Sequence, residues 1–192
     1  MNKEEFYSKK AKHEGYPARS IYKLQQINTK HKLLKPGQKI LELGAAPGSW
    51  AILSAKVIGK EGAIYALDTK KLSKSALGLS NLKFYQADLY NFDFKSELNI
   101  KFDLVLSDAA PNTTGIKSVD QLAAFNLNSE IIKIASENLK VNGALLMKSF
   151  QGAKTNELIS HLKQIYNQVN IEKPASSKKG SFEIFILGKH KK

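Results

Sequence analysis

The sequence predicts an α/β fold of Rossmann type, in which helices cover both faces of a seven-stranded, mostly parallel sheet with an antiparallel last strand. Three observations predict it. Short apolar runs alternate with longer amphipathic segments, the pattern of parallel strands that are connected by helices. A glycine-containing turn follows the first of these runs. The last two runs are separated only by the polar segment 173–180, so they should pair antiparallel.

The N-terminal segment is expected to lie outside this core. Residues 1–16 are polar and lysine-rich, and we interpret them as a basic arm that is partly disordered or weakly helical. Pro17 suits the first turn of a helix, and apolar residues at 21, 24 and 27 then follow at helical spacing. The turn 35–37 ends that helix. We therefore expect an arm at 1–16 and a single domain at 17–192.

The rest of the chain supplies the strands and helices of the domain. Strands are expected at 39–43, 63–67, 82–86, 103–107, 143–149, 168–171 and 183–187. Helices are expected at 49–58, 118–139 and 155–166, with short ones near 71–78 and 89–98. A chain of 192 residues is long enough for one sizeable core.

The amino-acid composition limits the classes of protein to which the chain can belong. No apolar run approaches the roughly 18 residues of a membrane span. The N-terminus carries acidic residues early and has no apolar h-region, so it does not resemble a signal peptide, and cysteine is absent. We therefore expect a cytoplasmic protein without disulfides or thiolate metal sites. The formal net charge of +13 points to a polyanionic partner, although a lysine-rich surface kept for solubility is the alternative. Of the 30 basic residues, only Arg19 is arginine.

The turn after the first strand indicates the cofactor. The dinucleotide fingerprint G-x-G-x-x-G would need glycine where Ala46 stands, and its third glycine comes early, at Gly48. The spacing instead matches the E/D-x-G-x-G-x-G loop of S-adenosylmethionine (SAM)-dependent methyltransferases, with Glu42, Gly44, Ala46 and Gly48 in register. This pattern makes the domain at 17–192 a candidate methyltransferase domain.

Two aspartates end the next two strands. Asp68 is placed to accept hydrogen bonds from the cofactor's ribose hydroxyls, and Asp88 to reach the adenine amine. The alternative is that each only caps the helix that follows.

Four further side chains stand where chemistry is expected. Asp108 follows the fourth strand at its carboxyl end. Lys148 lies in an otherwise apolar strand, where an unpaired lysine would be costly. Glu183 begins the last strand, and Lys23 lies on the N-terminal helix. Taken singly, each of these residues could equally be a cap, a strand-edge charge or a solvated residue.

Together these segments resemble the FtsJ/RrmJ family of ribosomal RNA 2′-O-methyltransferases, over about residues 14–188. The matching segments are 19–24 (RSIYKL), 43–50 (LGAAPGSW), 107–112 (SDAAPN), 148–152 (KSFQG) and 181–183 (SFE). The resemblance implies a catalytic tetrad of Lys23, Asp108, Lys148 and Glu183. The cofactor contacts that the pattern and the resemblance imply are Gly44, Gly48, Trp50, Asp68, Asp88 and Asp108. Ser49 and Pro17 depart from the family pattern, and Pro17 leaves Arg19 alone at the expected RNA entrance.

The resemblance also implies a mechanism and a partner. We expect neutral Lys148 to accept the proton of a ribose 2′-hydroxyl while Asp108 orients it. Lys23 and Glu183 would position the target ribose. No metal is expected, because the four histidines show no ligand spacing. The implied substrate is a uridine in RNA of a large-subunit ribosomal particle, and nothing in the sequence demands more than a monomer.

Lysines at both ends of the chain are candidates for RNA contact. The clusters are Lys3, Lys9, Lys10 and Lys12, and Lys173, Lys178, Lys179, Lys189, Lys191 and Lys192. If both flank the carboxyl edge of the sheet, they form a groove that follows the phosphates. The open alternatives are a tRNA 2′-O-methyltransferase and a catalytically inactive RNA-binding or ribosome-assembly protein. A nicotinamide-dependent oxidoreductase is disfavoured by the glycine spacing.

Overall fold

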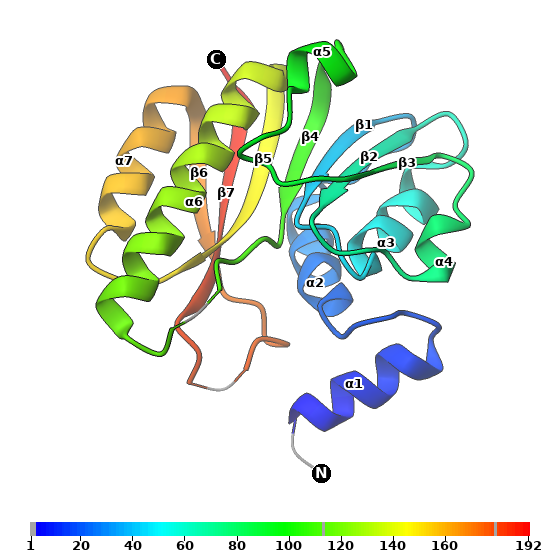
Figure 1. Ribbon diagram of the computed structural model, residues 1–192, viewed down its shortest axis with the longest axis horizontal. Helices are drawn as coiled ribbons and strands as arrows, with labels where there is room; N and C mark the ends of the chain where they lie inside the picture. Colours follow the sequence, from blue (N-terminus) through cyan, green and yellow to red (C-terminus); the bar gives the residue numbers. More distant parts are fainter. Residues whose placement is uncertain (1–2, 113, 179) are drawn as a thin grey trace.

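A computed structural model describes residues 3–112, 114–178 and 180–192, and Figure 1 shows a central sheet with helices on both sides. The elements, in chain order, are α1 (Lys3–His13), α2 (Ile21–His31), β1 (Lys39–Leu43), α3 (Ser49–Ile58), β2 (Ala63–Asp68), α4 (Lys74–Leu77), β3 (Leu82–Gln86), α5 (Phe94–Leu98), β4 (Phe102–Ser107), α6 (Lys117–Asn138), β5 (Leu139–Phe150), α7 (Thr155–Ile165), β6 (Tyr166–Glu172) and β7 (Glu183–Lys191).

The sheet has seven strands in the order β3-β2-β1-β4-β5-β7-β6. Strands β1 to β5 pair in parallel, and β7 inserts between β5 and β6, antiparallel to both. The predicted antiparallel last strand is therefore confirmed. Five strands are longer than the sequence predicted, by one residue in β2 and β4 and by more in β5, which begins at Leu139, in β6 and in β7, which runs to Lys191. The order reverses between β1 and β4, which places a switch point at the carboxyl edge of these two strands.

Alternating residues of each strand build two separate cores. On one face, Ile40 and Leu146 pack with α2 and α3, whereas on the other, Leu41 and Leu145 pack with α6 and α7. Successive side chains of a strand point to opposite faces, and both faces are buried, so the strands read as continuous apolar runs. This two-sided burial fixes which face each polar side chain at the carboxyl edge can reach.

The N-terminal segment differs from the expected arm. Residues 3–13 form the helix α1 instead of a partly disordered stretch, and Ala11 is buried against the core around α2. The ring of Tyr7, one helical turn earlier, lies 5.1 Å from that of Tyr22. An alanine and a tyrosine four residues apart share one face of a helix, which explains why this polar segment docks. Pro17 was wrongly placed in the first turn of α2, because that helix begins only at Ile21.

None of the described helices combines the length and the apolar character that crossing a bilayer requires.

Candidate active site

The glycine turn after β1 is shaped by a close approach of two backbone segments. Gly44 has a φ of 71°, and a Cβ at this position would lie 2.5 Å from the Cα of Ala109. Only glycine allows both the positive φ and this contact. The amide of Gly44 donates a hydrogen bond to the carbonyl of Leu67 at 2.9 Å. The turn is therefore held between the ends of β2 and β4.

Asp68 secures the same turn from β2. One of its carboxylate oxygens accepts from the amide of Ala46, and the other from the amide of Lys70, both at 2.8 Å. Asp68 does not cap the following helix, since Ser73 caps α4. Asp88 accepts from the amide of Tyr90 at 3.0 Å, and α5 likewise has its own cap. The helix-cap alternative is thus wrong for both aspartates.

A cleft of about 620 Å³ opens at the carboxyl ends of these strands. Its volume is typical of small-molecule sites. Gly44, Asp68, Asp88 and Asp108, four of the predicted cofactor contacts, line it together with segments of α6 and of the loop after β4. The cleft therefore lies at the switch point of the sheet.

Gly48 and Trp50, the other two predicted cofactor contacts, do not line this cleft. Gly48, with a φ of 104°, begins α3 and packs so closely that a Cβ would lie 2.4 Å from the Cβ of Ala76. The ring of Trp50 is buried, and its Nε1 donates to the carbonyl of Ser20 at 2.8 Å. The Trp50 side chain thus joins α3 to the start of α2, and only its backbone remains for a cofactor contact.

A buried acid lies beneath the turn. Glu42 on β1 is 2% exposed, and among the described residues its Oε2 has no hydrogen-bond partner. Burial, together with the nearby charges of Asp108 and Asp68, raises the pKa of Glu42 well above its usual value, although a bond from the amide of Ala51 opposes this. The sequence singled out Glu42 only as part of the glycine pattern, because its full burial cannot be read from that pattern.

The tetrad residues form two ion pairs. Lys23 Nζ lies 2.7 Å from Glu183 Oε2, and both side chains are little exposed, at 12% and 13%. Lys148 Nζ lies 3.1 Å from Asp108 Oδ1 and donates a hydrogen bond to the backbone carbonyl of Asp108. Oδ1 of Asp108 is buried, yet it accepts no hydrogen bond from the described residues.

The register of β5 and β7 brings the two pairs together. Lys148 pairs with Phe185 and Phe150 pairs with Glu183, so Lys148 and Glu183 are diagonal neighbours on one face of the sheet. Lys23 Nζ also lies 5.7 Å from the centroid of the Phe185 ring. Helix α2 therefore holds Lys23 over the strand position beside Lys148. The four side chains that the sequence selected come from α2, the loop after β4, β5 and β7, and they meet at one edge.

Ser177 supports this arrangement, and sequence reasoning missed it. Its hydroxyl donates to Glu183 Oε1 at 2.9 Å, while Lys23 holds the other oxygen of that carboxylate. Ser177 is buried, although it lies in the polar turn between β6 and β7. A serine in a lysine-rich turn carries no sequence signal for such a role.

The basic clusters divide between the two edges of the sheet. Lys191 donates to the backbone carbonyls of Ser136 and Leu139, at the end of α6, and Lys192 donates to those at the end of α7. Because β7 is antiparallel, its C-terminal lysines lie at the amino edge of the parallel strands, and the expectation that they flank the carboxyl edge is wrong for them. Lys178 does lie at the carboxyl edge, 3.5 Å from Glu4 of α1. Lys179 lies outside the described residues.

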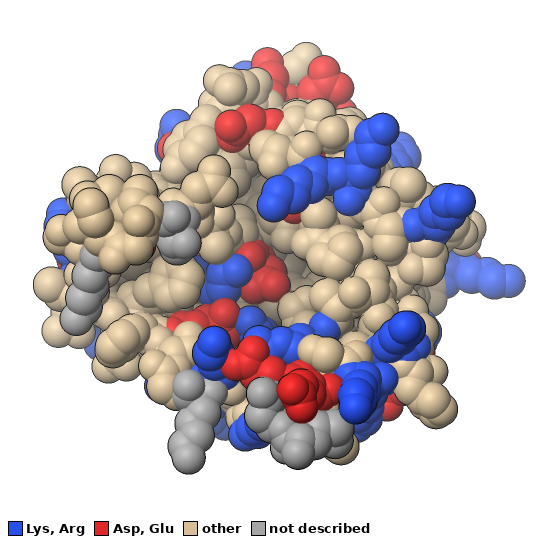
Figure 2. Space-filling model, turned by 60° about the horizontal axis from the view of Figure 1, so that its bottom comes forward, with Lys and Arg blue, Asp and Glu red and all other residues tan. Residues whose placement is uncertain are grey.

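Figure 2 views the end of the molecule that lies at the bottom of Figure 1, where the strands' carboxyl ends meet. This face is hollowed, basic and acidic side chains meet inside the hollow, and further basic side chains stand around it. The surface therefore combines a recessed, charge-paired site with a basic rim.

Comparison with known proteins places this site in a family. The sequence pattern of FtsJ-like methyltransferases matches residues 16–191. The chain belongs to the FtsJ-like methyltransferase family. The matched segment contains the whole tetrad and begins after α1.

Relatives of this FtsJ-like methyltransferase are similar over nearly their full length. A protein of Desulfatibacillum aliphaticivorans named Ribosomal RNA large subunit methyltransferase E is 39% identical over 188 residues, which is 97% of this chain and 90% of that protein. One of the same name from Neisseria meningitidis serogroup C is 40% identical over 191 residues, covering 97% and 91%.

Solved structures share the fold. A crystal structure from Plasmodium falciparum, described as a ribosomal RNA methyltransferase, superposes with a TM-score of 0.79 at 27% identity and covers 92% of this chain and 98% of that one. Fibrillarin of Aeropyrum pernix, solved with SAM, superposes with a TM-score of 0.57 at 17% identity, covering 81% and 68%. The second likeness concerns the fold alone.

Within residues 3–112, 114–178 and 180–192, no three His, Cys, Asp or Glu side chains gather in a group that could hold a metal ion. The expectation of metal-independent chemistry stays a prediction, which activity in excess chelator would test.

Proposed function

We propose that this chain transfers a methyl group from SAM to a ribose 2′-hydroxyl in large-subunit ribosomal RNA. The observation that carries the proposal is the convergence of two ion pairs, Lys23–Glu183 and Lys148–Asp108, of which Asp108 also lines the cleft. One side chain thereby connects the cofactor cleft with a basic amine. The names of the relatives support ribosomal RNA as the substrate.

The cleft residues fit SAM. The close approach at Gly44 brings bare backbone to the cleft wall, where a side chain at this position would displace Ala109. Each oxygen of Asp68 has one backbone partner and can accept a second hydrogen bond, as ribose hydroxyls would provide. The carboxylate of Asp108 lines the cleft while its Oδ1 lies 3.1 Å from Lys148 Nζ, so its negative charge is available to a cationic donor group in the cleft as well as to that amine. Asp88 lines the cleft at the end of β3, where the adenine amine is expected.

The chain's own residues then have defined tasks. When bound, SAM supplies a methyl group that its sulfonium has already activated, with a neutral thioether as the leaving group. Lys148, in its neutral form, accepts the proton of the 2′-hydroxyl while that oxygen forms its bond to the methyl carbon. The carboxylate and the carbonyl of Asp108 hold the amine of Lys148 in place. Lys23 and Glu183 orient the ribose, because they fix the position of each other's polar atoms.

Substitution of Lys148 tests the catalytic part of the proposal. Lys148→Ala should lower methyl transfer by at least about 100-fold, the typical contribution of a positioned acid or base. SAM binding, measured by calorimetry, should remain close to that of wild type, since Lys148 does not line the cleft. Near-normal turnover of this variant would remove Lys148 from the mechanism.

Mapping of ribose methylation tests the substrate. Total RNA from cells with and without the protein should differ at a 2′-O-methylated position of large-subunit ribosomal RNA. A difference confined to tRNA would favour the tRNA methyltransferase, and SAM binding without any methylated RNA would favour the inactive assembly protein. The basic rim around the hollow supports an RNA substrate of either kind.

A further inference from the structure

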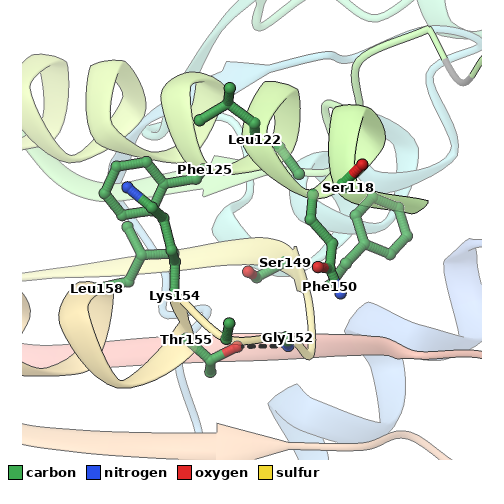
Figure 3. Close-up of a pocket in the computed structure, with 12 residues that line it drawn as sticks. Ser118, Leu122, Phe125, Ser149, Phe150, Gly152, Lys154, Thr155 and Leu158 are labelled. Atoms are coloured by element: carbon green, nitrogen blue, oxygen red, sulfur yellow. Dashed lines mark hydrogen bonds between the residues drawn. The ribbon is translucent and has the colours of Figure 1, made fainter. Parts of the chain in front are cut away.

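A second cavity, of about 190 Å³, lies on the other side of α6 from the cofactor cleft. It is enclosed by the first turns of α6, the end of β5 and the start of α7, and it shares no lining residue with the cleft. In Figure 3, Leu122 of α6 stands opposite Gly152 and Thr155, with Ser149 between them. No residue of the tetrad lines it, so the mechanism above leaves this cavity without a role.

The position of the cavity links it to the catalytic edge. Ser149 and Phe150, which line it, directly follow Lys148 on β5, and Phe150 pairs with Glu183 on β7. The cavity therefore lies at the carboxyl end of β5, on the face of the sheet that α6 and α7 cover, whereas Lys148 points to the face of α2. An RNA strand that crosses this edge with one ribose at Lys148 would bring a base of the same strand to the opening.

The lining combines apolar surface with a few polar groups. Phe125, Phe150 and Leu158 provide rings and apolar surface, and Lys154 Nζ lies 4.2 Å from the centroid of the Phe125 ring. Lys154 also lies 3.9 Å from Glu157, and its side chain is half exposed, so its charge faces solvent at the mouth. Phosphate oxygens passing the mouth could pair with this ammonium.

Gln121 gives the cavity a hydrogen-bonding group. Its amide packs against Gly152 so closely that a Cβ there would lie 2.6 Å from its Nε2. Among the described residues this amide has no hydrogen-bond partner. Both a donor and an acceptor are thus available beside an apolar wall. That combination suits the edge and the face of a planar heterocycle.

Exposed apolar side chains continue the wall toward solvent. Leu122, which lines the cavity, is 51% exposed, and Val119, one turn earlier on α6, is 47% exposed. Exposed apolar side chains beside a cavity mark a contact surface, and the uncharged face of an unstacked base can pack against them.

We propose that this cavity takes one unstacked base of the RNA strand whose ribose is methylated. The inference rests on the proposed function, because it needs RNA at the catalytic edge. The volume is smaller than that of typical small-molecule sites, which suits a single base better than a whole nucleotide or a base pair. The base would stack on Phe125 or Phe150, bond to Gln121 and leave its phosphate near Lys154.

Binding of synthetic RNA tests the proposal. The probes are an abasic oligoribonucleotide, which keeps every phosphate and 2′-hydroxyl, and the same oligomer with one central uridine. Wild-type protein should bind the uridine-containing oligomer more tightly, by about 5- to 100-fold, which corresponds to one base–aromatic stack. Phe125→Leu keeps apolar volume but removes the ring, and Leu122→Ala alters an exposed position that the fold tolerates. Both variants should reduce this preference while binding the abasic oligomer as wild type does.

A matched control variant and a measurement of methyl transfer distinguish failure of this inference from failure of the proposed function. Val141→Ala changes an apolar residue that is 71% exposed near the start of β5, far along the strand from the site, and should keep the full preference. Equal binding of both oligomers by wild type, or an unchanged preference in both cavity variants, would overturn the inference even if ribosomal RNA is methylated normally. If neither oligomer binds and no RNA is methylated, the proposed function itself fails.

The source of the base can be resolved in the same system. Once the methylated position is mapped, an abasic site is placed either at the methylated nucleotide or at its neighbour, and methyl transfer is measured. One of the two abasic substrates should slow methyl transfer by wild type but should not slow the Phe125→Leu variant further. The base that this substrate lacks is the one that occupies the cavity. If each abasic substitution and Phe125→Leu add their effects independently, the cavity does not bind a base.

Discussion

The buried carboxyl of Glu42 should make the stability of this protein fall as pH rises. It is 2% exposed, Oε2 has no hydrogen-bond partner among the described residues, and the charges of Asp108 and Asp68 lie close enough to raise its pKa further. The folded protein therefore keeps a proton on Glu42 at pH values where the unfolded chain, with an ordinary pKa near about 4.3, has lost it.

The sign and size follow from proton linkage. Between the unfolded and the folded pKa of Glu42, unfolding releases a proton, so higher pH favours the unfolded chain. The free energy of unfolding should fall by about 1.4 kcal/mol for each pH unit in that window, and level off above the folded pKa. Because the pKa of Glu42 in the folded protein lies well above its usual value, the free energy of unfolding should continue to fall as pH rises well above about 5.

The substitution Glu42→Gln removes the titration while it keeps the shape of the side chain. Urea unfolding of wild type and variant, followed at several pH values between about 5 and 8, should give curves that diverge as pH rises, with the variant gaining relative stability. The slope is the decisive quantity, since an amide in this site also changes a hydrogen bond by about 1 kcal/mol at every pH. Glu61→Gln, at an exposed position, should leave the wild-type slope unchanged. Parallel pH curves for wild type and Glu42→Gln would refute the reasoning.

Three further predictions concern other parts of the site and its frame. Gly44→Ala should weaken SAM binding at least about tenfold, because its Cβ would displace Ala109. Gly59 has a similar φ but open space around it, so Gly59→Ala should cost about 1–3 kcal/mol of stability through backbone strain alone and leave SAM binding intact. Equal SAM affinity in both variants would contradict this. Ser177→Ala should lower kcat about two- to tenfold with KM little changed, since the Glu183 carboxylate loses one of its two hydrogen-bond partners. Ser177→Thr keeps the hydroxyl and should restore the rate. An unchanged kcat in Ser177→Ala would show that Lys23 alone positions that carboxylate. Lys191→Met should reduce the free energy of unfolding by about 1 kcal/mol, because the ammonium of Lys191 holds the end of α6. The salt dependence of RNA binding should not change, because Lys191 lies at the amino edge of the parallel strands. A weaker salt dependence in the variant would indicate that Lys191 contacts RNA.

The parallel core was predictable because its signals are local and strong. The apolar run 39–43 and the helix 49–58 coincide with the bounds of β1 and α3, since two-sided burial makes a continuous apolar strand and Gly48 marks the turn. The start of β5 was not predictable in the same way. Residues 140–142 are all exposed and include two polar residues, Lys140 and Asn142, so their sequence shows no alternation of apolar and polar positions. They nevertheless belong to the strand, which begins at Leu139. Docking of α1 likewise depends on Ala11 and Tyr7, which are too few to stand out among lysines.

The sequence predicted the four residues of the proposed tetrad, but it did not predict how they pair. Sequence order does not reveal that Lys23 contacts Glu183 and that Lys148 contacts Asp108, because the pairing depends on how α2 crosses the sheet and on the register of β5 against β7. The placement of the C-terminal lysines could have been inferred, since an antiparallel last strand must end at the amino edge. Trp50 illustrates the opposite case, in which a motif residue has its side chain in the core.

The charge balance of the tetrad determines which substitutions can separate a chemical role from a structural one. Before Lys148 loses a proton to become the acceptor, two ammonium groups and two carboxylates leave the tetrad neutral, which offsets the desolvation of its little-exposed side chains. Truncation of one member leaves its partner as an uncompensated, buried charge, so part of any lost activity would reflect a distorted site and not a missing chemical role. The informative comparison is therefore Lys23→Met and Glu183→Gln, singly and together. If the pair acts by holding its own geometry, the double variant should be no worse than the more impaired single variant.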